Sequence, residues 1–259
     1  MFDHLTYQIQ DGVCTIALNR PDVYNALNTK LNFELQEAFK QAAKDEAVRV
    51  VVLTGNGPAF CSGADLKEFA GKGLASYSQA VRSRYNPMIL AMRNMPKPII
   101  GRINGVAAGA GCSLALACDI TVAAEEAYLT EAFVGIGLVM DSGSGYFLPR
   151  LVGSAKAFEL ATLGSKVPAK EAVALGMVNQ VVPAAQLDEA VARYAQQYAN
   201  APTKAIGLMK RMLNKSFQAS LEEMLEWEAL YQDVAGASQD HREGVTAFLE
   251  KRKPVFRGK

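Results

Sequence analysis

Residues 49–54 read RVVVLT, a run of β-branched and aliphatic side chains without the apolar and polar alternation of a half-exposed strand. A strand of this kind is buried on both faces, which is typical of a parallel sheet covered by helices. Similar runs occur at 97–103 and 119–124, and a shorter one at 176–182, with helical periodicity between them. The first 200 residues are therefore expected to adopt an α/β fold.

The chain begins with a different pattern. Alternating segments at 5–9 and 13–18 flank Asp11 and Gly12, a dipeptide that favours a hairpin turn. A helix is expected to follow, with Thr29 as its N-cap. Further along, residues 71–76 show little regularity and are expected to form a mobile surface link.

The C-terminal part is helical throughout. Segments 203–215, 219–235 and 240–252 show helical periodicity with no strand between them. Because three such helices cannot extend a sheet, they should form an appendage or pack against another subunit. We therefore predict a core region of residues 1–200 and a helical oligomerisation region of residues 201–259.

Composition excludes several classes of protein. Half of the 259 residues are hydrophobic, and 27 Lys and Arg balance 26 Asp and Glu. Such a chain has a sizeable core but no basic field for nucleic acid. The N-terminus does not resemble a signal peptide, and no apolar run approaches the ~20 residues of a membrane span. A cytoplasmic protein without a membrane partner is expected.

The residues that usually bind metals are sparse. The four cysteines have spacings that match neither a zinc site nor a redox pair, so small buried thiols are expected. His4 and His241 are the only histidines, one near each end of the chain. A Ser-His-Asp arrangement or a histidine-rich metal centre is therefore not expected.

The stretch GVAAGAG at 105–111 carries no reactive side chain, and a small-residue helix begins near Ala110. Glycines let a backbone approach a ligand closely, and the first turn of a helix has free N–H groups. The stretch thus fits an anion or oxyanion site made of backbone alone, but also simple close packing of a helix on a strand. It lacks the glycine spacing of a dinucleotide fingerprint and the lysine of a Walker loop.

Two more loops have related features. PAFCSGADL at 58–66 also runs from a buried strand through small residues into a helix, and its Asp65 could act only as a helix-start charge. Loops that follow neighbouring parallel strands can converge at one sheet edge. In the glycine-rich segment 133–149, Asp141 could be an N-cap, or a general base whose pKa is raised by apolar surroundings.

With these loops, the sequence resembles the crotonase, or enoyl-CoA hydratase/isomerase, superfamily along nearly its whole length. The matching segments are NRPDVYNAL at 19–27, FCSGADL at 60–66, NGVAAGAG at 104–111, LPRLVG at 148–153 and REGVTAFLEKR at 242–252. The resemblance implies a spiral of ββα units, a C-terminal helical trimerisation region that gives a homotrimer or a dimer of trimers, and an acyl-CoA substrate. It implies no metal and no separate cofactor, since coenzyme A enters as part of the substrate.

The resemblance also implies roles for individual residues. The thioester oxygen would lie between the backbone N–H groups of Ala64 and Ala110. Residues expected to contact the substrate or its CoA part are Ala26, Leu27, Ser62, Asp65, Leu66, Gly109 and Lys251.

The acidic residues separate the subfamilies. Hydratases of the family resemble one another in two glutamates, which would fall here at Ser113 and Phe133, while Glu131 is displaced by two positions. Asp141, by contrast, matches the aspartate of several isomerases in the family, and the pattern looks most like the ring-1,2-epoxyphenylacetyl-CoA isomerases. Those enzymes usually have a proline where this chain has Met140.

We therefore predict an acyl-CoA isomerase with Asp141 as the base and an enolate held by two N–H groups. It would move a double bond, or open a ring epoxide to an oxepin. One alternative is an enoyl-CoA hydratase that uses Glu131 or a water held in another way. Another is a non-catalytic homologue that binds acyl-CoA or RNA; near-neutral charge disfavours RNA, and an intact Asp141 disfavours a non-catalytic scaffold.

Overall fold

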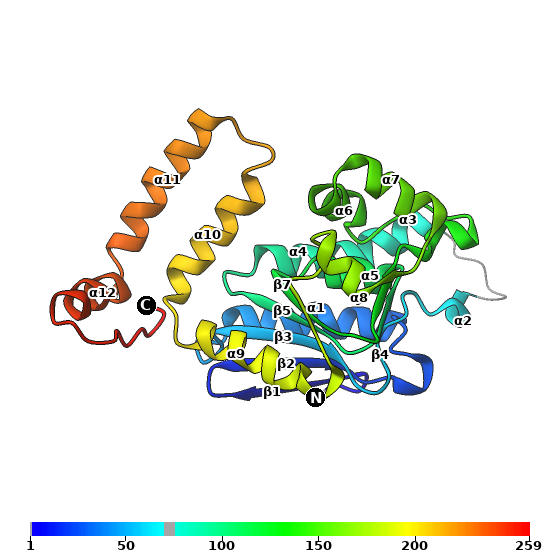
Figure 1. Ribbon diagram of the computed structural model, residues 1–259, viewed down its shortest axis with the longest axis horizontal. Helices are drawn as coiled ribbons and strands as arrows, with labels where there is room; N and C mark the ends of the chain where they lie inside the picture. Colours follow the sequence, from blue (N-terminus) through cyan, green and yellow to red (C-terminus); the bar gives the residue numbers. More distant parts are fainter. Residues whose placement is uncertain (1, 70–75) are drawn as a thin grey trace.

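The computed structural model describes residues 2–69 and 76–259 (Figure 1). The segment predicted to be a mobile link, 71–76, lies outside the described residues except for Ser76. Two sheets, one of six strands and one of four, form the centre of the fold, and helices cover them.

The six-stranded sheet has the order β1-β2-β3-β5-β7-β10. Its strands are β1 (Leu5–Gln10), β2 (Val13–Leu18), β3 (Val50–Gly55), β5 (Ile99–Ile103), β7 (Ile120–Ala124) and β10 (Gln180–Val182). The first two pair as the predicted antiparallel hairpin, and all other neighbours are parallel. All four predicted β-branched runs are therefore strands of one sheet, although β10 is shorter than the segment 176–182.

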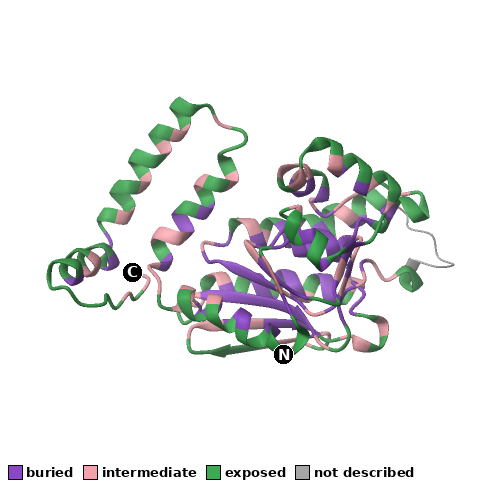
Figure 2. Ribbon diagram, viewed as in Figure 1, coloured by how far each residue is buried: buried purple, intermediate pink, exposed green. Residues whose placement is uncertain are grey.

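The residues of β3 explain its uninterrupted apolar run. Successive side chains of a strand point to opposite faces. Val51 and Leu53 belong to the main core, whereas Val50 and Val52 belong to a second cluster under α9 (Leu187–Ala199). Both faces of the strand are thus covered, as Figure 2 shows by the buried colour of the central strands.

The four-stranded sheet has the order β4-β6-β8-β9. Its strands are β4 (Ala59–Cys61), β6 (Val106–Ala108), β8 (Tyr128–Thr130) and β9 (Val167–Pro168). In each of the pairs β3/β4, β5/β6 and β7/β8, the first strand joins the large sheet and the second joins the small one. This repetition produces the predicted α/β spiral of ββα units.

Helices connect these strand pairs. Helix α1 (Thr29–Lys44) begins where predicted, but its N-cap is Asn28 rather than Thr29, since the Asn28 side chain accepts the N–H of Leu31. The amide oxygen of Asn28 thereby satisfies a donor of the first turn that has no partner within the helix. The other helices before α9 are α2 (Leu66–Phe69), α3 (Tyr77–Ala80), α4 (Asn86–Asn94), α5 (Ala110–Leu116), α6 (Ser144–Val152), α7 (Ser154–Leu163) and α8 (Ala169–Ala174). Shorter helical segments are η1 (Pro21–Val23), the π-helix η2 (Val81–Tyr85), η3 (Ala132–Ile136) and η4 (Ala184–Gln186).

The three C-terminal helices form an arm beside the core (Figure 1). They are α10 (Thr203–Lys215), α11 (Leu221–Gly236) and α12 (Gln239–Leu249), close to the predicted segments. Buried Lys210 ties α10 to the core, because its ammonium lies 2.6 Å from a carboxylate oxygen of Asp119. The predicted boundary at 200/201 falls in the link between α9 and α10.

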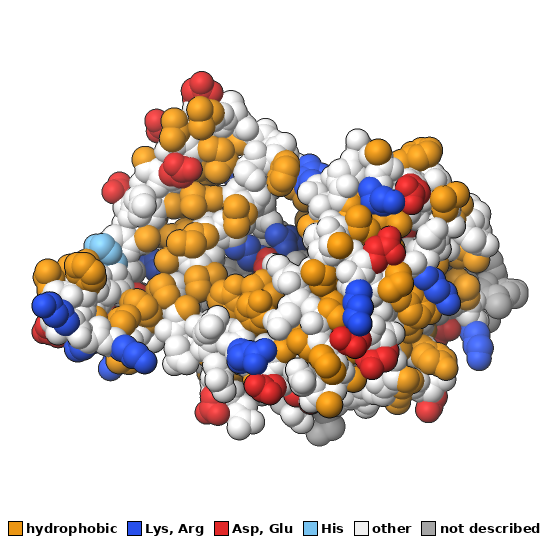
Figure 3. All heavy atoms as spheres, viewed as in Figure 1, with side chains coloured by type: hydrophobic (Ala, Val, Ile, Leu, Met, Phe, Trp, Pro, Cys, Tyr) orange, Lys and Arg blue, Asp and Glu red, His pale blue; other side chains and the backbone are white. Residues whose placement is uncertain are grey.

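Apolar side chains gather on this arm, as Figure 3 shows in orange. The larger exposed ones on α10, on α11 and in the link between these helices are Met209, Leu213, Phe217, Leu221, Leu225, Leu230 and Val234. In the described part of the chain, no helix combines the length and apolar character needed to cross a bilayer.

Candidate active site

Three loops meet at one edge of the small sheet, because β4, β6 and β8 are parallel neighbours. Cys61 pairs with Ala107, and Ala108 pairs with Thr130. The loops that follow these strands therefore start side by side, as the carboxyl ends of parallel strands do. One carries Ala64, the next leads into Ala110, and the third begins at Glu131.

The backbones of the first two loops are in close contact, which explains why each of them has a glycine at the point of contact. A Cβ on Gly63 would lie 2.7 Å from the carbonyl oxygen of Ala108, and Gly63 has a φ of +93°. A Cβ on Gly111 would lie only 2.2 Å from the carbonyl oxygen of Cys61. The close packing that was one interpretation of the stretch is therefore present, and it brings the two loops together.

The amides of Ala64 and Ala110 are the predicted oxyanion donors. Neither N–H donates a hydrogen bond to any other group in the described parts of the chain. Ala110 is the first residue of α5, where an N–H has no partner in the helix. On either side of Ala64, Gly63 and Asp65 are tied to Leu27 by hydrogen bonds of 2.7 and 3.1 Å, so the Ala64 amide is held in place.

Arg20 links the two segments predicted to contact CoA. Its guanidinium donates to the carbonyl oxygen of Ala26 at 2.5 Å and to a carboxylate oxygen of Asp65 at 2.8 Å. Asp65 also accepts the N–H of Lys67 at the start of α2, so its helix-start role is present as well. The role of Arg20 was not predicted, although the residue lies within the matching segment 19–27.

The remaining predicted contacts divide into two groups. Ser62 and Leu66 lie in the β4–α2 segment, with the leucine half-exposed, and Gly109 immediately precedes Ala110. Lys251 follows α12, and Figure 1 places that helix at the opposite end of the molecule from α2. Ser62, Leu66 and Gly109 therefore lie at this edge of the small sheet, whereas Lys251 does not, and its contact with CoA stays a prediction.

Asp141 lies before α6 and is half-buried. Burial raises the pKa of its carboxyl group, while a 2.7 Å hydrogen bond from the Ser142 hydroxyl acts in the opposite direction. Asp141 is not the N-cap of α6, since that position belongs to Gly143. A carboxylate with a raised pKa in a partly desolvated loop has the properties of a general base.

Neither of the two positions at which hydratases of the family have a glutamate is acidic in this chain. Ser113 is fully buried, and its hydroxyl lies 2.7 Å from the hydroxyl of Ser144. The ring of Phe133 is buried next to Gly109, 4.0 Å from where a Cβ on that glycine would be. Glu131 is buried, with one carboxylate oxygen accepting a 2.8 Å hydrogen bond from Ser144. That contact was not predicted, and no local pattern in the sequence indicates it.

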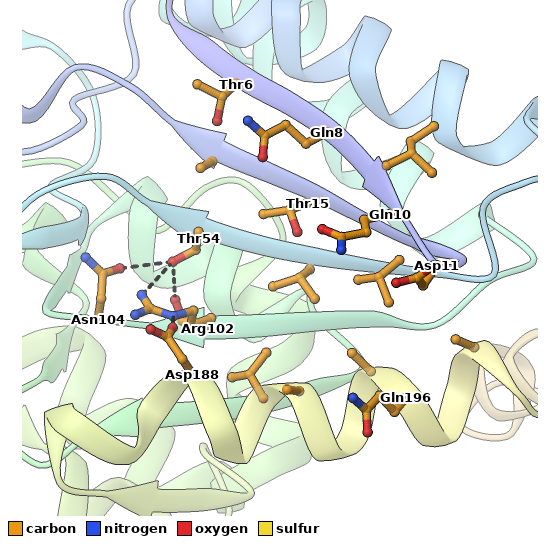
Figure 4. A pocket seen from close by; sticks show the side chains of 18 of the residues that line it. Thr6, Gln8, Gln10, Asp11, Thr15, Thr54, Arg102, Asn104, Asp188 and Gln196 are labelled. Carbon is orange, nitrogen blue, oxygen red and sulfur yellow. Dashed lines mark hydrogen bonds and ion pairs between the residues drawn. The ribbon is translucent and has the colours of Figure 1, made fainter.

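A hollow of about 1310 Å³ lies away from these loops, between the outer face of the large sheet and α9 (Figure 4). Within its lining, Arg102 forms a 2.7 Å ion pair with Asp188 and donates a hydrogen bond to the Thr54 hydroxyl. None of its lining residues is one of the predicted site residues. The hollow is therefore not the candidate active site.

Cysteine and metal chemistry find no support at this edge. Each cysteine is buried and free, and burial raises the thiol pKa of Cys61 to about 12. Over residues 2–69 and 76–259, no group of three or more His, Cys, Asp and Glu side chains could hold a metal ion.

A crotonase-type spiral whose loops present two free amides and a carboxylate belongs to a class of enzymes that act on acyl-CoA thioesters. The family model described as enoyl-CoA hydratase/isomerase matches residues 8–259. This chain belongs to the enoyl-CoA hydratase/isomerase family.

Its similarity to known members extends over the whole length. It is 40% identical to 1,2-epoxyphenylacetyl-CoA isomerase of Escherichia coli, covering 100% of both chains. It is also 40% identical to a probable enoyl-CoA hydratase of Rhodobacter capsulatus, over 98% of each chain. The crystal structure of an enoyl-CoA hydratase from Mycobacterium smegmatis superposes with a TM-score of 0.93 at 34% identity, covering 98% of this chain and 99% of that one. Isomerases and hydratases are thus equally close, and the chain is a CoA-thioester isomerase or hydratase.

Proposed function

We propose that this protein is an isomerase of acyl-CoA thioesters in which Asp141 is the only general base. The observation that carries the proposal is the chemistry of the two hydratase positions. Ser113 and Phe133 leave no pair of carboxylates to hold a water, whereas Asp141 has a carboxyl group of raised pKa. An isomerase needs one base, since its product keeps every atom of the substrate.

The reaction begins with removal of a proton from the carbon next to the thioester. Asp141 takes this proton, and the electron pair of the C–H bond moves to the thioester oxygen to form an enolate. The N–H groups of Ala64 and Ala110 donate to that oxygen. In a comparable oxyanion hole one such donor contributes about 3–4 kcal/mol.

Return of the proton completes the reaction. In a β,γ-unsaturated thioester, Asp141 delivers the proton to the γ-carbon, and the double bond moves into conjugation with the carbonyl group. In a ring epoxide of phenylacetyl-CoA, like that named for the Escherichia coli relative, the bond between the two epoxide carbons would break to give the seven-membered oxepin ring, and Asp141 would return the proton to a ring carbon. Coenzyme A enters with the substrate, and the reaction needs no separate cofactor.

The substitution Asp141→Asn tests this proposal. It keeps the shape of the side chain but removes the base, so isomerisation of a 3-enoyl-CoA should fall by a factor on the order of 10²–10⁴. Asp188→Asn, at an exposed carboxylate on α9, is the matched control and should leave the rate unchanged. Undiminished isomerisation by Asp141→Asn would show that the base is wrongly assigned.

A hydration assay tests the second candidate function, that of an enoyl-CoA hydratase. The 40% identity to a probable hydratase and the buried acid Glu131 favour testing it. The purified protein at high concentration should hydrate crotonyl-CoA slowly or not at all. Rapid hydration that persists in Asp141→Asn would favour the hydratase.

The C-terminal arm supports a proposal about assembly. Its exposed apolar side chains are those expected to be covered in a homotrimer or a dimer of trimers. In such an assembly, Lys251 of one copy would be available to the CoA of a neighbouring copy. Light scattering of the purified protein should give three or six times the mass of one chain, and a monomer would contradict the proposal.

A further inference from the structure

A buried carboxylate lies beside the Asp141 loop and has no part in the reaction proposed above. Glu131, directly after β8, is only 2% exposed. Its Oε1 accepts a hydrogen bond from the hydroxyl of Ser144 at 2.8 Å. Its Oε2 has no hydrogen-bond partner in the described parts of the chain. An acid in this position is costly to ionise, and its surroundings decide its charge.

Two hydroxyl groups connect Glu131 to the Asp141 loop. The Ser144 oxygen lies 2.7 Å from the hydroxyl of Ser113, which lies 3.1 Å from the carbonyl oxygen of Asp141. Ser113 and Ser144 are both completely buried. These groups form a continuous chain that we call the Glu131 relay: Glu131, Ser144, Ser113 and the Asp141 carbonyl.

The relay has two arrangements of protons on the same heavy atoms, since each hydroxyl can donate only one hydrogen bond. When Glu131 is ionised, Ser144 donates to it and Ser113 donates to Ser144. When Glu131 is protonated, it can donate to Ser144, which donates to Ser113. The Ser113 hydroxyl is then free to donate to the Asp141 carbonyl oxygen at 3.1 Å, which is nearer than its other acceptor, the Gly109 carbonyl oxygen at 3.3 Å. The second arrangement adds a hydrogen bond to the backbone of the base, beside the existing 3.0 Å bond from the Ser144 N–H.

We propose that Glu131 is a positioning residue that controls the base Asp141 through the Glu131 relay and through the repulsion between the two carboxylates. This inference rests on the proposed function. With Glu131 ionised, Asp141 is the stronger base and its carbonyl group is free of Ser113. With Glu131 neutral, Asp141 binds a proton less tightly, and its loop gains the additional hydrogen bond.

Glu131 gains and loses its charge at mildly acidic pH. Burial raises its pKa to about 6, against the lowering effects of the Ser144 hydrogen bond and of the nearby Cys112 thiol, and the charge of Asp141 raises it further. The titratable groups that act on it in the described chain are Cys112 from α5 and Asp141. Burial holds the pKa of the Cys112 thiol well above its ordinary value, so that group stays neutral. The relay therefore changes state near pH 6.

Three variants and one matched control test the proposal through the pH dependence of isomerisation of a 3-enoyl-CoA. Wild-type kcat should fall by about tenfold in a step near pH 6, where Glu131 gains its proton, in addition to the fall caused by protonation of Asp141 itself. Glu131→Gln keeps an oxygen acceptor for Ser144 but has no charge. It should lose about tenfold in kcat at pH 8 with KM within twofold, and its pH profile should lack the step near pH 6. This loss is smaller than the 10²–10⁴-fold contribution of a general base itself.

Ser144→Ala supplies the second measurement, because it retains Glu131 but interrupts the relay. Its step near pH 6 should become smaller, although the buried acid is still present. Glu126→Gln, at an exposed carboxylate on the turn before β8, should keep the wild-type profile. The third variant is Asp141→Asn, which tests the base itself.

The outcomes separate the two proposals. If Asp141→Asn still isomerises, the proposed function fails, whatever Glu131 does. If Asp141→Asn is inactive while Glu131→Gln keeps the step near pH 6, only the inference is wrong. A Ser144→Ala profile identical to that of the wild type would show that the relay does not transmit the charge of Glu131, even if Glu131→Gln does not fold.

Discussion

The substitution Glu131→Gln should also change the pH dependence of the stability of the fold. Glutamine has nearly the volume of glutamate and can still accept the hydrogen bond from Ser144. It cannot ionise, so it removes the contribution of this one group to proton-linked stability. The comparison with the wild type therefore isolates the free energy of burying a carboxylate between β8 and α6.

The magnitude follows from the pKa of Glu131, which burial raises from 4.5 to about 6. Between these two values of pH, the unfolded chain has released the proton of Glu131 and the folded chain has kept it. Stability from this group is therefore fully present below pH 4.5 and is lost as the pH rises through 6. A difference of about 1.5 pH units corresponds to roughly 2 kcal/mol.

Urea-induced unfolding at fixed protein concentration, followed by circular dichroism from pH 4 to pH 7.5, measures this effect. The free energy of unfolding of Glu131→Gln minus that of the wild type should rise by about 2 kcal/mol across the range. The exposed carboxylate of Glu126 provides the control for loss of an acid as such, and Glu126→Gln should follow the wild-type curve. A difference between Glu131→Gln and wild type that stays constant with pH would refute the assignment of a raised pKa to Glu131.

Two further predictions concern backbone and packing. Gly63→Ala should lower the free energy of unfolding by about 2 kcal/mol or more and lower kcat for isomerisation, because its φ is +93° and the new Cβ would lie 2.7 Å from the Ala108 carbonyl oxygen. A variant with wild-type stability in urea and wild-type kcat would contradict that geometry. Lys210→Met should destabilise the protein by about 2 kcal/mol or more in the same urea assay, since it leaves Asp119 without one of its two cationic partners. Full stability after this change would show that the 2.6 Å ion pair does not hold α10 on the core.

Much of the fold could be predicted from local pattern. The run at 49–54 is apolar throughout because both faces of β3 are covered, and that is visible in the sequence itself. The helix start near residue 29 was also predicted, but not its cap. Asn28 and Thr29 are both good capping residues, and only the backbone conformation shows that the Asn28 side chain reaches the Leu31 N–H.

The candidate site was predictable where it depends on backbone. Small residues before a helix predict free amides, and the structure leaves the Ala64 and Ala110 N–H groups without partners among the described residues. The absence of glutamates at 113 and 133 is equally plain in the sequence. Lys251 differs, because α12 lies far from these loops in the fold, and its contact with CoA stays a prediction.

By itself, the sequence determined the strands of the large sheet, the C-terminal helices, the stretch without reactive side chains, and which acids are missing from the hydratase positions. These features depend on the type and spacing of residues along the chain. The sequence did not indicate the short strands of the small sheet. The tertiary structure alone decided that Glu131, Ser144 and Ser113 form one hydrogen-bonded chain ending at Asp141. Such contacts join loops that follow different strands, and they exist only because parallel strands of one sheet bring those loops to the same edge.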